Sequence, residues 1–306
     1  MRLPGVLVIA ALSAMAAFTV PERLLSQEPK LFRGRVDLVN VGVTVADKKR
    51  QLITNLDASD FAIFEDGKPQ TIFAFARGEE TGPPLHIGVL LDISASQAED
   101  LDFTQSAVIK FLTSLGDAED VTFITFSDRV RGTRVPRSEL PYLLEGIRQL
   151  RAGGGTAMYD AIASYLDGAS EQSGRKVMVL YTDGADTRST LRIGELMKML
   201  KSSDVTVYTI GMLDNQLLSQ QLMQRAILAD IAESTGGAAF FPWRAKDLDK
   251  IYAQVLGEVH AQYTLGYLST NEATDGKWRK VEIKLTRPET KRLKVRARKG
   301  YYAAKG

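Results

Sequence analysis

The sequence predicts an α/β protein with a doubly wound, mostly parallel sheet, inserted in or flanked by a β-sandwich of N- and C-terminal strands. Two observations favour this fold class. Through the middle of the chain, apolar strand-like runs alternate with helical patterns, as in a parallel sheet covered on both faces. Towards both ends, apolar and polar residues alternate instead, which is typical of strands with one buried side.

Length and composition narrow the classes of function. The chain has 306 residues, 44% hydrophobic and 25% charged, enough for two domains with substantial cores. It contains no cysteine, so neither a disulfide nor a thiol reaction is available. His86 and His260 are the only histidines, which leaves few ways to build a histidine-based active site. The net charge of +2 does not indicate an acidic partner.

The N-terminus has the features of a secretory signal peptide. One arginine precedes an apolar stretch from Leu3 to Val20, and Ala14-Met15-Ala16 offers a small-x-small cleavage pattern. We therefore assign residues 1–26 to the signal peptide and the start of the mature chain, and expect a secreted or periplasmic protein. An uncleaved anchor is the alternative, because the stretch is near the ~18-residue lower limit for a spanning helix.

Residues 31–80 are predicted to form an N-terminal β segment. In "VDLVNVGVTV" at 36–45, valines alternate with other residues on one face of a strand. The run "FAIFEDGKPQTIFAF" at 61–75 is interpreted as a hairpin that turns at Asp66-Gly67. The composition of "GEETGPP" at 78–84 indicates a linker.

Residues 85–260 are predicted to form the doubly wound domain. The expected strands are 85–91, 121–126, 177–181 and 205–210, and the expected helices are 99–115, 157–170, 190–202, 217–234 and 246–260. The "SDR" at 127–129 is expected to turn a hairpin that adds one antiparallel edge strand.

Residues 261–306 return to a β pattern and are expected to pair with 31–80, because either segment alone is too short for a stable core. Residues 262–306 hold 12 Lys and Arg against 4 Asp and Glu. A polyanion-binding patch is one interpretation, but strict alternation with apolar residues favours the outer face of strands. Stacking aromatics do not interleave with the charges, so no nucleic-acid partner is expected.

Polar side chains follow the ends of separate predicted strands. Asp92, Ser94 and Ser96 follow the first strand of the middle domain in "VLLDISASQ", Asp183 follows another in "VMVLYTDGADT", and Thr156 lies in "RAGGGTAMYD". Ligands of doubly wound sheets bind beyond the carboxyl ends of the strands, so these side chains are expected to converge if the strands are adjacent. Glycines allow the third loop to bend sharply before a helix.

These five residues offer only oxygen donors, which suits a hard divalent cation. Mg²⁺ wants about six oxygens in an octahedral array, whereas softer metals are disfavoured without His or Cys. Mn²⁺ and Ca²⁺ remain possible. Neutral hydroxyls leave more positive charge on the ion than carboxylates would, so the ion remains a good acceptor for an outside carboxylate. The composition of the set therefore favours a binding role.

The motifs "DISAS", "GGGT" and "TDG" resemble the metal-ion-dependent adhesion site of von Willebrand factor type A domains, over about residues 85–260. The flanking β segments are similar to those of secreted bacterial proteins that carry such a domain. The resemblance implies direct metal contact by Ser94 and Ser96, and by Thr156 in the ligand-competent state. It implies that Asp92 and Asp183 act directly or through water, and that a partner's Asp or Glu completes the coordination. The sequence departs at Gln97, where the family often has Met at a position that is not a ligand.

The first hypothesis is therefore a non-catalytic adhesion module that captures an acidic residue of a protein partner. The resemblance further implies that the helix at 246–260 shifts when ligand arrives. A metal-dependent phosphohydrolase is the second hypothesis, although Ser94 stands where phosphatases of the haloacid dehalogenase type need a second Asp. A G-x-S-x-G serine hydrolase is poorly supported, because Asp92 and Ser96 replace the glycines. A metal-free scaffold is the third hypothesis.

Simpler structural roles are open for several residues. Asp92 could be a helix N-cap, and a turn role is favoured for Asp186 over assistance to the metal site. His86 is expected to be a buried structural residue. His260 is expected at the end of a helix, where it can interact favourably with the negative end of the helix dipole. Trp243 is expected to pack against other residues. Core packing is also expected for Leu217, Leu218 and Leu222.

Overall fold

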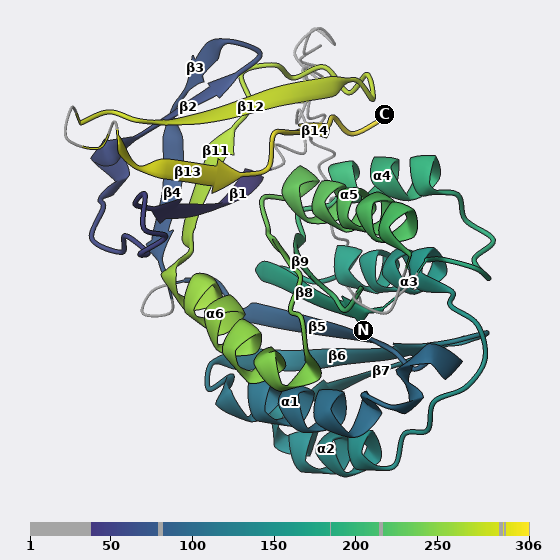
Figure 1. Ribbon diagram of the computed structural model, residues 1–306. Coiled ribbons are helices and arrows are strands. Elements are labelled where there is room, and N and C mark those ends of the chain that lie inside the picture. The colour runs from purple at the N-terminus through teal and green to yellow at the C-terminus, as the bar shows by residue number, and fades with distance from the viewer. Residues whose placement is uncertain are drawn as a thin grey trace, which may run out of the picture. The chain divides into compact units, whose positions relative to one another are not determined.

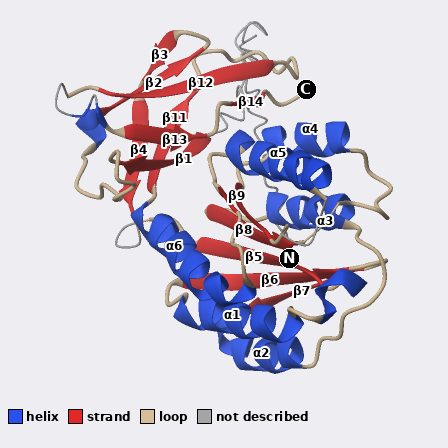
Figure 2. Cartoon of the chain, in the orientation of Figure 1, coloured by secondary structure: helices blue, strands red, loops and turns tan. Residues whose placement is uncertain are grey.

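A computed structural model describes residues 38–78, 82–183, 185–213, 217–287, 290 and 292–305. Residues Val36–Gly306 form one compact unit, whose helices and strands are shown in Figures 1 and 2. The predicted signal peptide lies outside the described residues. In the described ranges, none of the helices is long and apolar enough to cross a membrane.

A six-stranded sheet forms the centre of the α/β region, in the order β10-β9-β8-β5-β6-β7. Its strands are β5 (Leu85–Asp92), β6 (Ala118–Phe126), β7 (Val130–Pro136), β8 (Arg175–Thr182), β9 (Thr206–Gly211) and β10 (Ala239–Phe240). All neighbours are parallel except β6 and β7, which confirms the predicted hairpin at 127–129. The strand order reverses between β5 and β8, so their carboxyl ends border a topological switch point.

Helices cover both faces of this sheet (Figure 1). One layer contains α1 (Leu101–Ser114), α2 (Leu140–Arg148) and α6 (Leu248–Ala261), and the other contains α3 (Met158–Ser170), α4 (Ile193–Ser202) and α5 (Leu218–Ser234). Leu91 of β5 packs into the first layer and Leu90 into the second, so the whole strand is buried. Gly88 lets α3 approach closely, because a Cβ there would lie 2.1 Å from the Tyr165 ring.

Two four-stranded antiparallel sheets flank this region, in the orders β13-β1-β11-β4 and β14-β12-β2-β3. Their N-terminal strands are β1 (Leu38–Ala46), β2 (Phe61–Glu65), β3 (Lys68–Gln70) and β4 (Ile72–Arg77). Their C-terminal strands are β11 (Tyr263–Leu268), β12 (Trp278–Leu285), β13 (Lys294–Ala297) and β14 (Gly300–Tyr302). Because β1 pairs with β11 and β2 with β12, strands from both ends of the chain share each sheet. The predicted fold class is confirmed.

The predicted hairpin at 61–75 is shorter in the structure. Strands β2 and β3 pair around Asp66 and Gly67, whose φ angles of 48° and 80° place both in the left-handed region that a tight hairpin turn requires. The chain then leaves this sheet, and β4 pairs with β11 in the other. One apolar run therefore supplies strands to both sheets.

A buried carboxylate joins strands from both ends of the chain inside the sandwich. Glu65 of β2 is 2% exposed and accepts hydrogen bonds from Tyr267 (2.7 Å), Tyr301 (2.9 Å) and Ser269 (2.6 Å). Burial, followed by the Glu65 carboxylate, raises the pKa of Tyr301 to about 12. All three hydroxyls therefore stay protonated and can donate at neutral pH.

Several basic residues of the C-terminal segment have structural roles. Arg279 and Arg298 are buried, at 4% and 8% exposure, rather than on the outer face of strands. Arg279 pairs with Asp275 at 2.8 Å, and Arg296 pairs with Glu258 of α6. The outer-face interpretation is therefore wrong for Arg279 and Arg298, since their charges serve internal contacts.

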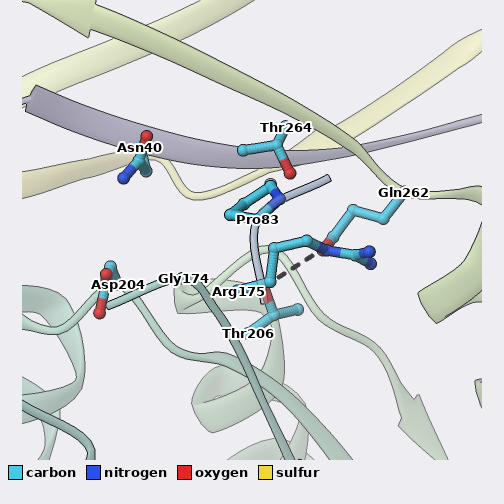
Figure 3. A pocket seen from close by; sticks show the side chains of 9 residues that line it. Asn40, Pro83, Gly174, Arg175, Asp204, Thr206, Gln262 and Thr264 are labelled. Carbon is cyan, nitrogen blue, oxygen red and sulfur yellow. Dashed lines mark hydrogen bonds between the residues drawn. The ribbon is translucent and has the colours of Figure 1, made fainter. Parts of the chain in front are cut away.

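The amino end of the central sheet is closed by polar contacts. Arg175, at the start of β8, donates to the carbonyl oxygens of Gly78 and Val259, and Lys176 pairs with Asp204 at 2.6 Å. Figure 3 shows Arg175, Asp204 and Gln262 around a pocket of about 20 Å³, room for roughly one water molecule.

Candidate metal centre

Asp92 is the last residue of β5 and is completely buried. Its Oδ1 accepts a hydrogen bond from the Ser94 backbone N–H at 2.9 Å, and its Oδ2 accepts one from the Thr182 hydroxyl at 2.7 Å. Burial raises the pKa of Asp92 to about 6, and the nearby Asp183 charge adds to the rise. The fold thus holds a carboxylate where desolvation disfavours its charge.

Two serine hydroxyls connect the loop after β5 to Asp183, which follows β8. Ser94 Oγ lies 3.1 Å from Ser96 Oγ, and Ser96 Oγ donates to Asp183 Oδ1 at 3.0 Å. Ser94 is 1% exposed, whereas Ser96 is exposed to solvent. Burial also raises the pKa of Asp183. Because β5 and β8 are parallel neighbours, the structure brings four of the five predicted residues together.

The loop that carries Thr156 lies against the other two loops. Gly153 N–H donates to Ile93 O at 2.8 Å, and Gly154 O accepts from Ala95 N–H at 3.0 Å. Gly154 has φ +85°, a conformation that favours glycine. Thr156 is 6% exposed. Among the described residues, its hydroxyl has no hydrogen bond to the other four site residues, so the structure brings the Thr156 loop to the site without joining that side chain to them.

Asp186 holds a neighbouring loop in place. Its Oδ2 accepts from the Tyr159 N–H at the start of α3 (2.9 Å) and from the Ser189 hydroxyl (2.6 Å), while Oδ1 accepts from Ser189 N–H (3.0 Å). The adjacent Thr187 hydroxyl accepts from Thr156 N–H at 3.0 Å. Asp186 therefore has the expected turn role, and it supports the Thr156 loop indirectly.

The spacing of the oxygens fits a small hard cation. Adjacent ligands of an octahedral ion with metal–oxygen bonds of about 2.1 Å lie about 3 Å apart. The Ser94–Ser96 and Ser96–Asp183 oxygen pairs have this spacing, at 3.1 and 3.0 Å. In the described part of the chain, no group of three or more His, Asp or Glu gathers as a metal site. A cation here would depend on the serine and threonine hydroxyls.

Thr182 is a neighbour of the candidate site that sequence analysis missed. It precedes Asp183 in "TDG" and is fully buried, with its hydroxyl bonded to Asp92. Only the pairing of β8 with β5 shows that Asp92 lies beside Thr182. The N-cap interpretation of Asp92 is wrong, since α1 begins at Leu101 and its N-cap residue is Asp100.

The two histidines lie outside the candidate site. His86 is 8% exposed, and its ring nitrogens contact Asp120 Oδ2 at 3.0 Å and Ser173 O at 2.9 Å. This confirms its structural role. His260 lies in the last turn of α6, as expected, 3.8 Å from Asp117.

Two packing predictions are wrong. Leu217, Leu218 and Leu222 are 71%, 69% and 60% exposed, because the first turns of α5 extend beyond the residues it packs against, and burial begins at Gln224. Trp243, in the loop before α6, is 71% exposed. The prediction from apolar character alone therefore overestimated the burial of these leucines and of Trp243.

These features define a class of protein: an α/β domain with an oxygen-donor site beyond the carboxyl ends of its strands. The model of the von Willebrand factor type A domain matches residues 86–254, more than half of the chain, so the chain belongs to this family. Members of the family commonly mediate metal-dependent protein interactions. The predicted membership of this family is confirmed.

Solved structures agree with this fold. The chain is similar to a von Willebrand factor type A protein from Catenulispora acidiphila, with a TM-score of 0.51 and 16% identity over 68% of this chain and 51% of that one. It is also similar to the open conformation of the pilus adhesin SpaC from Lactobacillus rhamnosus GG, with a TM-score of 0.51 and 11% identity over 80% of this chain and 48% of that one. The chain thus spans about half the length of each. A search of curated protein sequences finds no match.

Proposed function

We propose that this protein is a non-catalytic, extracytoplasmic binding module that captures an acidic residue of a protein partner through a divalent cation. Asp92, Ser94, Ser96, Thr156 and Asp183 would hold the cation. When bound, a divalent cation supplies a positive acceptor for the partner's carboxylate. Mg²⁺ suits the oxygen spacing best, with Mn²⁺ and Ca²⁺ as alternatives.

One observation supports the proposal above all: the carboxylates that end neighbouring strands share one cluster of oxygens. Ser94 donates its backbone N–H to Asp92, and its hydroxyl leads through the Ser96 hydroxyl to Asp183, with oxygen–oxygen distances of 3.1 and 3.0 Å. Ser96 is exposed, so a partner could approach the site from solvent. Only two of the five residues carry charge. The negative charge of the protein ligands would therefore not exceed the charge of a divalent ion, and the bound ion could accept one more carboxylate.

A binding role also suits the surroundings better than hydrolysis does. His86 is held at the amino end of the sheet by Asp120 and Ser173, too far from Asp92 along β5 to act as its base. Ser94, two residues after Asp92, donates its backbone N–H to that carboxylate and offers no general acid. Turnover of a phosphate ester that disappears in Asp92→Ala would instead support the hydrolase alternative.

The first experiment is calorimetric titration of Mg²⁺, Mn²⁺ and Ca²⁺ into the mature protein and into Ser94→Ala/Ser96→Ala. The matched control is Ser202→Ala/Ser203→Ala, which removes two hydroxyls that bond to backbone carbonyls at the end of α4. We expect saturable one-site binding by wild type and control, and loss of binding in the first variant. Equal binding by all three proteins would contradict the proposed ligands.

The partner's chemistry can be tested with a random peptide display library selected against the protein in Mg²⁺ and in EDTA. Peptides selected only in Mg²⁺ should each depend on one Asp or Glu, and its amide replacement should abolish binding. Selection of the same peptides in both conditions would contradict metal-dependent capture.

We further propose that binding is transmitted to the sandwich through α6, since the helix leads directly into β11. Glu258 near its end pairs with Arg296 of β13, and Arg175 bonds to Val259 O. Structures of the metal-loaded protein with and without a selected acidic peptide would test this. An unchanged position of α6 would contradict it.

A further inference from the structure

The exposed apolar side chains of the α/β region gather at one edge of its sheet. The helices after β5, β8 and β9 each return the chain to the amino edge, so α1, α4 and α5 begin at the carboxyl edge, where the candidate metal centre lies. Of the large apolar side chains that are exposed in the described part of this region, only Tyr142 lies elsewhere, because α2 follows the antiparallel strand β7. The others lie at the start of α1 (Phe103), of α4 (Ile193) and of α5, and after β10 (Trp243).

Four of these side chains form one apolar surface on the first turns of α5. Leu217, Leu218, Leu222 and Met223, here called the α5 surface, are each more than half exposed. Leu218 and Leu222 are one helical turn apart and lie on the same face. None of the residues from 217 to 224 is charged. Single exposed leucines need no explanation, but an uncharged apolar surface of this kind is typical of the centre of a protein interface.

Two hydrogen bonds connect the α5 surface to the candidate metal centre. Met212 N–H, directly after β9, donates to the carbonyl oxygen of Thr182 at 3.0 Å, and Thr182 is the last residue of β8. The carbonyl oxygen of Leu213, one residue further on, accepts from the side-chain amide of Gln221 in α5 at 3.3 Å. Gln221 directly precedes Leu222. The α5 surface therefore borders the candidate metal centre on the side of β9.

We propose that the α5 surface contacts large apolar side chains of the same partner segment whose Asp or Glu the cation captures. The partner is therefore a protein segment in which the acidic residue has large apolar neighbours. A second acidic residue placed on this surface would lose water without gaining a counter-ion. This inference rests on the proposed metal-dependent capture and deepens it, because the ion recognises only a carboxylate, whereas the α5 surface distinguishes among acidic segments.

The test uses peptides selected from a random display library that bind the mature protein in Mg²⁺ and not in EDTA. We expect each to carry a large apolar residue at a constant spacing from its essential Asp or Glu. Leu218→Ser/Leu222→Ser should raise the peptide Kd about 10-fold and leave the Kd for Mg²⁺ unchanged. The matched control is Phe73→Ser/Tyr142→Ser, which removes two apolar side chains that are exposed away from this edge and should change neither Kd.

The outcomes separate this inference from the proposed function. Metal-dependent peptides without an apolar requirement, or equal peptide binding by wild type and Leu218→Ser/Leu222→Ser, would overturn the inference and leave metal-dependent capture intact. Peptides that bind equally in Mg²⁺ and EDTA, and are lost in the double variant, would contradict the proposed function while supporting the α5 surface as a contact for apolar side chains. Sedimentation velocity tests a second copy of the chain as the occupant: self-association of wild type that disappears in the double variant would overturn the inference.

Discussion

Two buried carboxylates in different regions of the molecule are stabilised in opposite ways. Asp60, in the sandwich, is 2% exposed and forms two contacts with the Arg287 guanidinium, which hold its pKa below the usual range. Asp92, at the carboxyl end of β5, is fully buried among a backbone N–H and neutral hydroxyls, and its pKa is raised to about 6. The sandwich supplies its own cation, whereas the main influences on the pKa of Asp92 are burial, the Ser94 and Thr182 donors and the Asp183 charge.

This difference indicates what each site is for. A buried carboxylate without a counter-ion is costly, and such groups cluster at functional sites. Glu65 shows that hydroxyls alone can also hold a carboxylate structurally, with three donors converging on it. Asp92 differs from Glu65 because Ser94, whose backbone N–H donates to Asp92, is connected through its own hydroxyl and the exposed Ser96 to a second carboxylate, Asp183. We therefore infer that Asp92 obtains its cation from solution.

The largest expected effect follows from removing the cation of the sandwich. Arg287→Ala leaves Asp60 buried without its ion pair and should lower the free energy of unfolding by about 2–4 kcal/mol, since Arg287 itself is half-exposed. Urea unfolding would measure it. Lys284→Ala, which breaks an exposed pair with Glu282, is the control and should change stability by less than about 1 kcal/mol. If Arg287→Ala left the free energy of unfolding nearly unchanged, the comparison between the two carboxylates would be contradicted.

The candidate metal centre should respond in the opposite direction. Asp92→Asn removes a buried charge that the metal-free fold tolerates poorly, and a pKa rise from 3.8 to about 6 corresponds to about 3 kcal/mol at most. We expect the variant to be about 1–3 kcal/mol more stable than wild type in EDTA at pH 7, and unable to bind Mg²⁺. Destabilisation in EDTA would show that Asp92 is a structural anchor.

The pH dependence of stability should separate the two carboxylates. The folded-state pKa of Asp92 is raised, so its cost grows as pH rises from about 4 to about 6 and is full above that. The advantage of Asp92→Asn in EDTA should therefore shrink as pH falls from 7 to 4. The folded-state pKa of Asp60 is lowered, so its contribution is present above pH 3.8 and is lost as pH falls further. Urea unfolding at a series of pH values would show both trends, and a constant advantage of Asp92→Asn would contradict the first.

The smallest expected effect concerns Glu65. Glu65→Gln keeps one acceptor oxygen but offers amide hydrogens to hydroxyls that now donate, and should cost about 1–2 kcal/mol in thermal or urea unfolding. Mg²⁺ affinity should not change, because Glu65 lies in the sandwich. A change in Mg²⁺ affinity would mean that the two regions are coupled more strongly than their contacts indicate.

The sequence predicted the central sheet and most of the site for a physical reason. Fully apolar runs such as 85–91 must be buried on both faces, and the residues that end such strands meet at one edge of a parallel sheet. Asp92 and Asp183 were therefore expected to converge if their strands were adjacent, and β5 and β8 are adjacent. The alternation in 36–45 likewise predicted a one-sided strand, and Val41, Val43 and Val45 are buried.

Other features could not be predicted because they depend on neighbours distant in sequence. Thr182 is a neutral residue whose partner, Asp92, becomes visible only when β5 and β8 lie side by side. The exposure of Leu218 and Trp243 depends on where packing ends along α5 and before α6, which apolar patterns do not encode. Helix α2 (Leu140–Arg148) was also missed, although the proline in its first turn is compatible with the start of a helix.

The central claim, that Asp92 takes its cation from solution, is tested most directly by Mg²⁺ calorimetry at pH 6 and pH 8 in buffers of different ionisation enthalpy. We predict saturable one-site binding that releases about half a proton at pH 6, where Asp92 is half-protonated, and almost none at pH 8. Asp92→Asn should show no binding at either pH. Wild-type protein that binds no Mg²⁺, or Asp92→Asn that binds it equally well, would contradict the account.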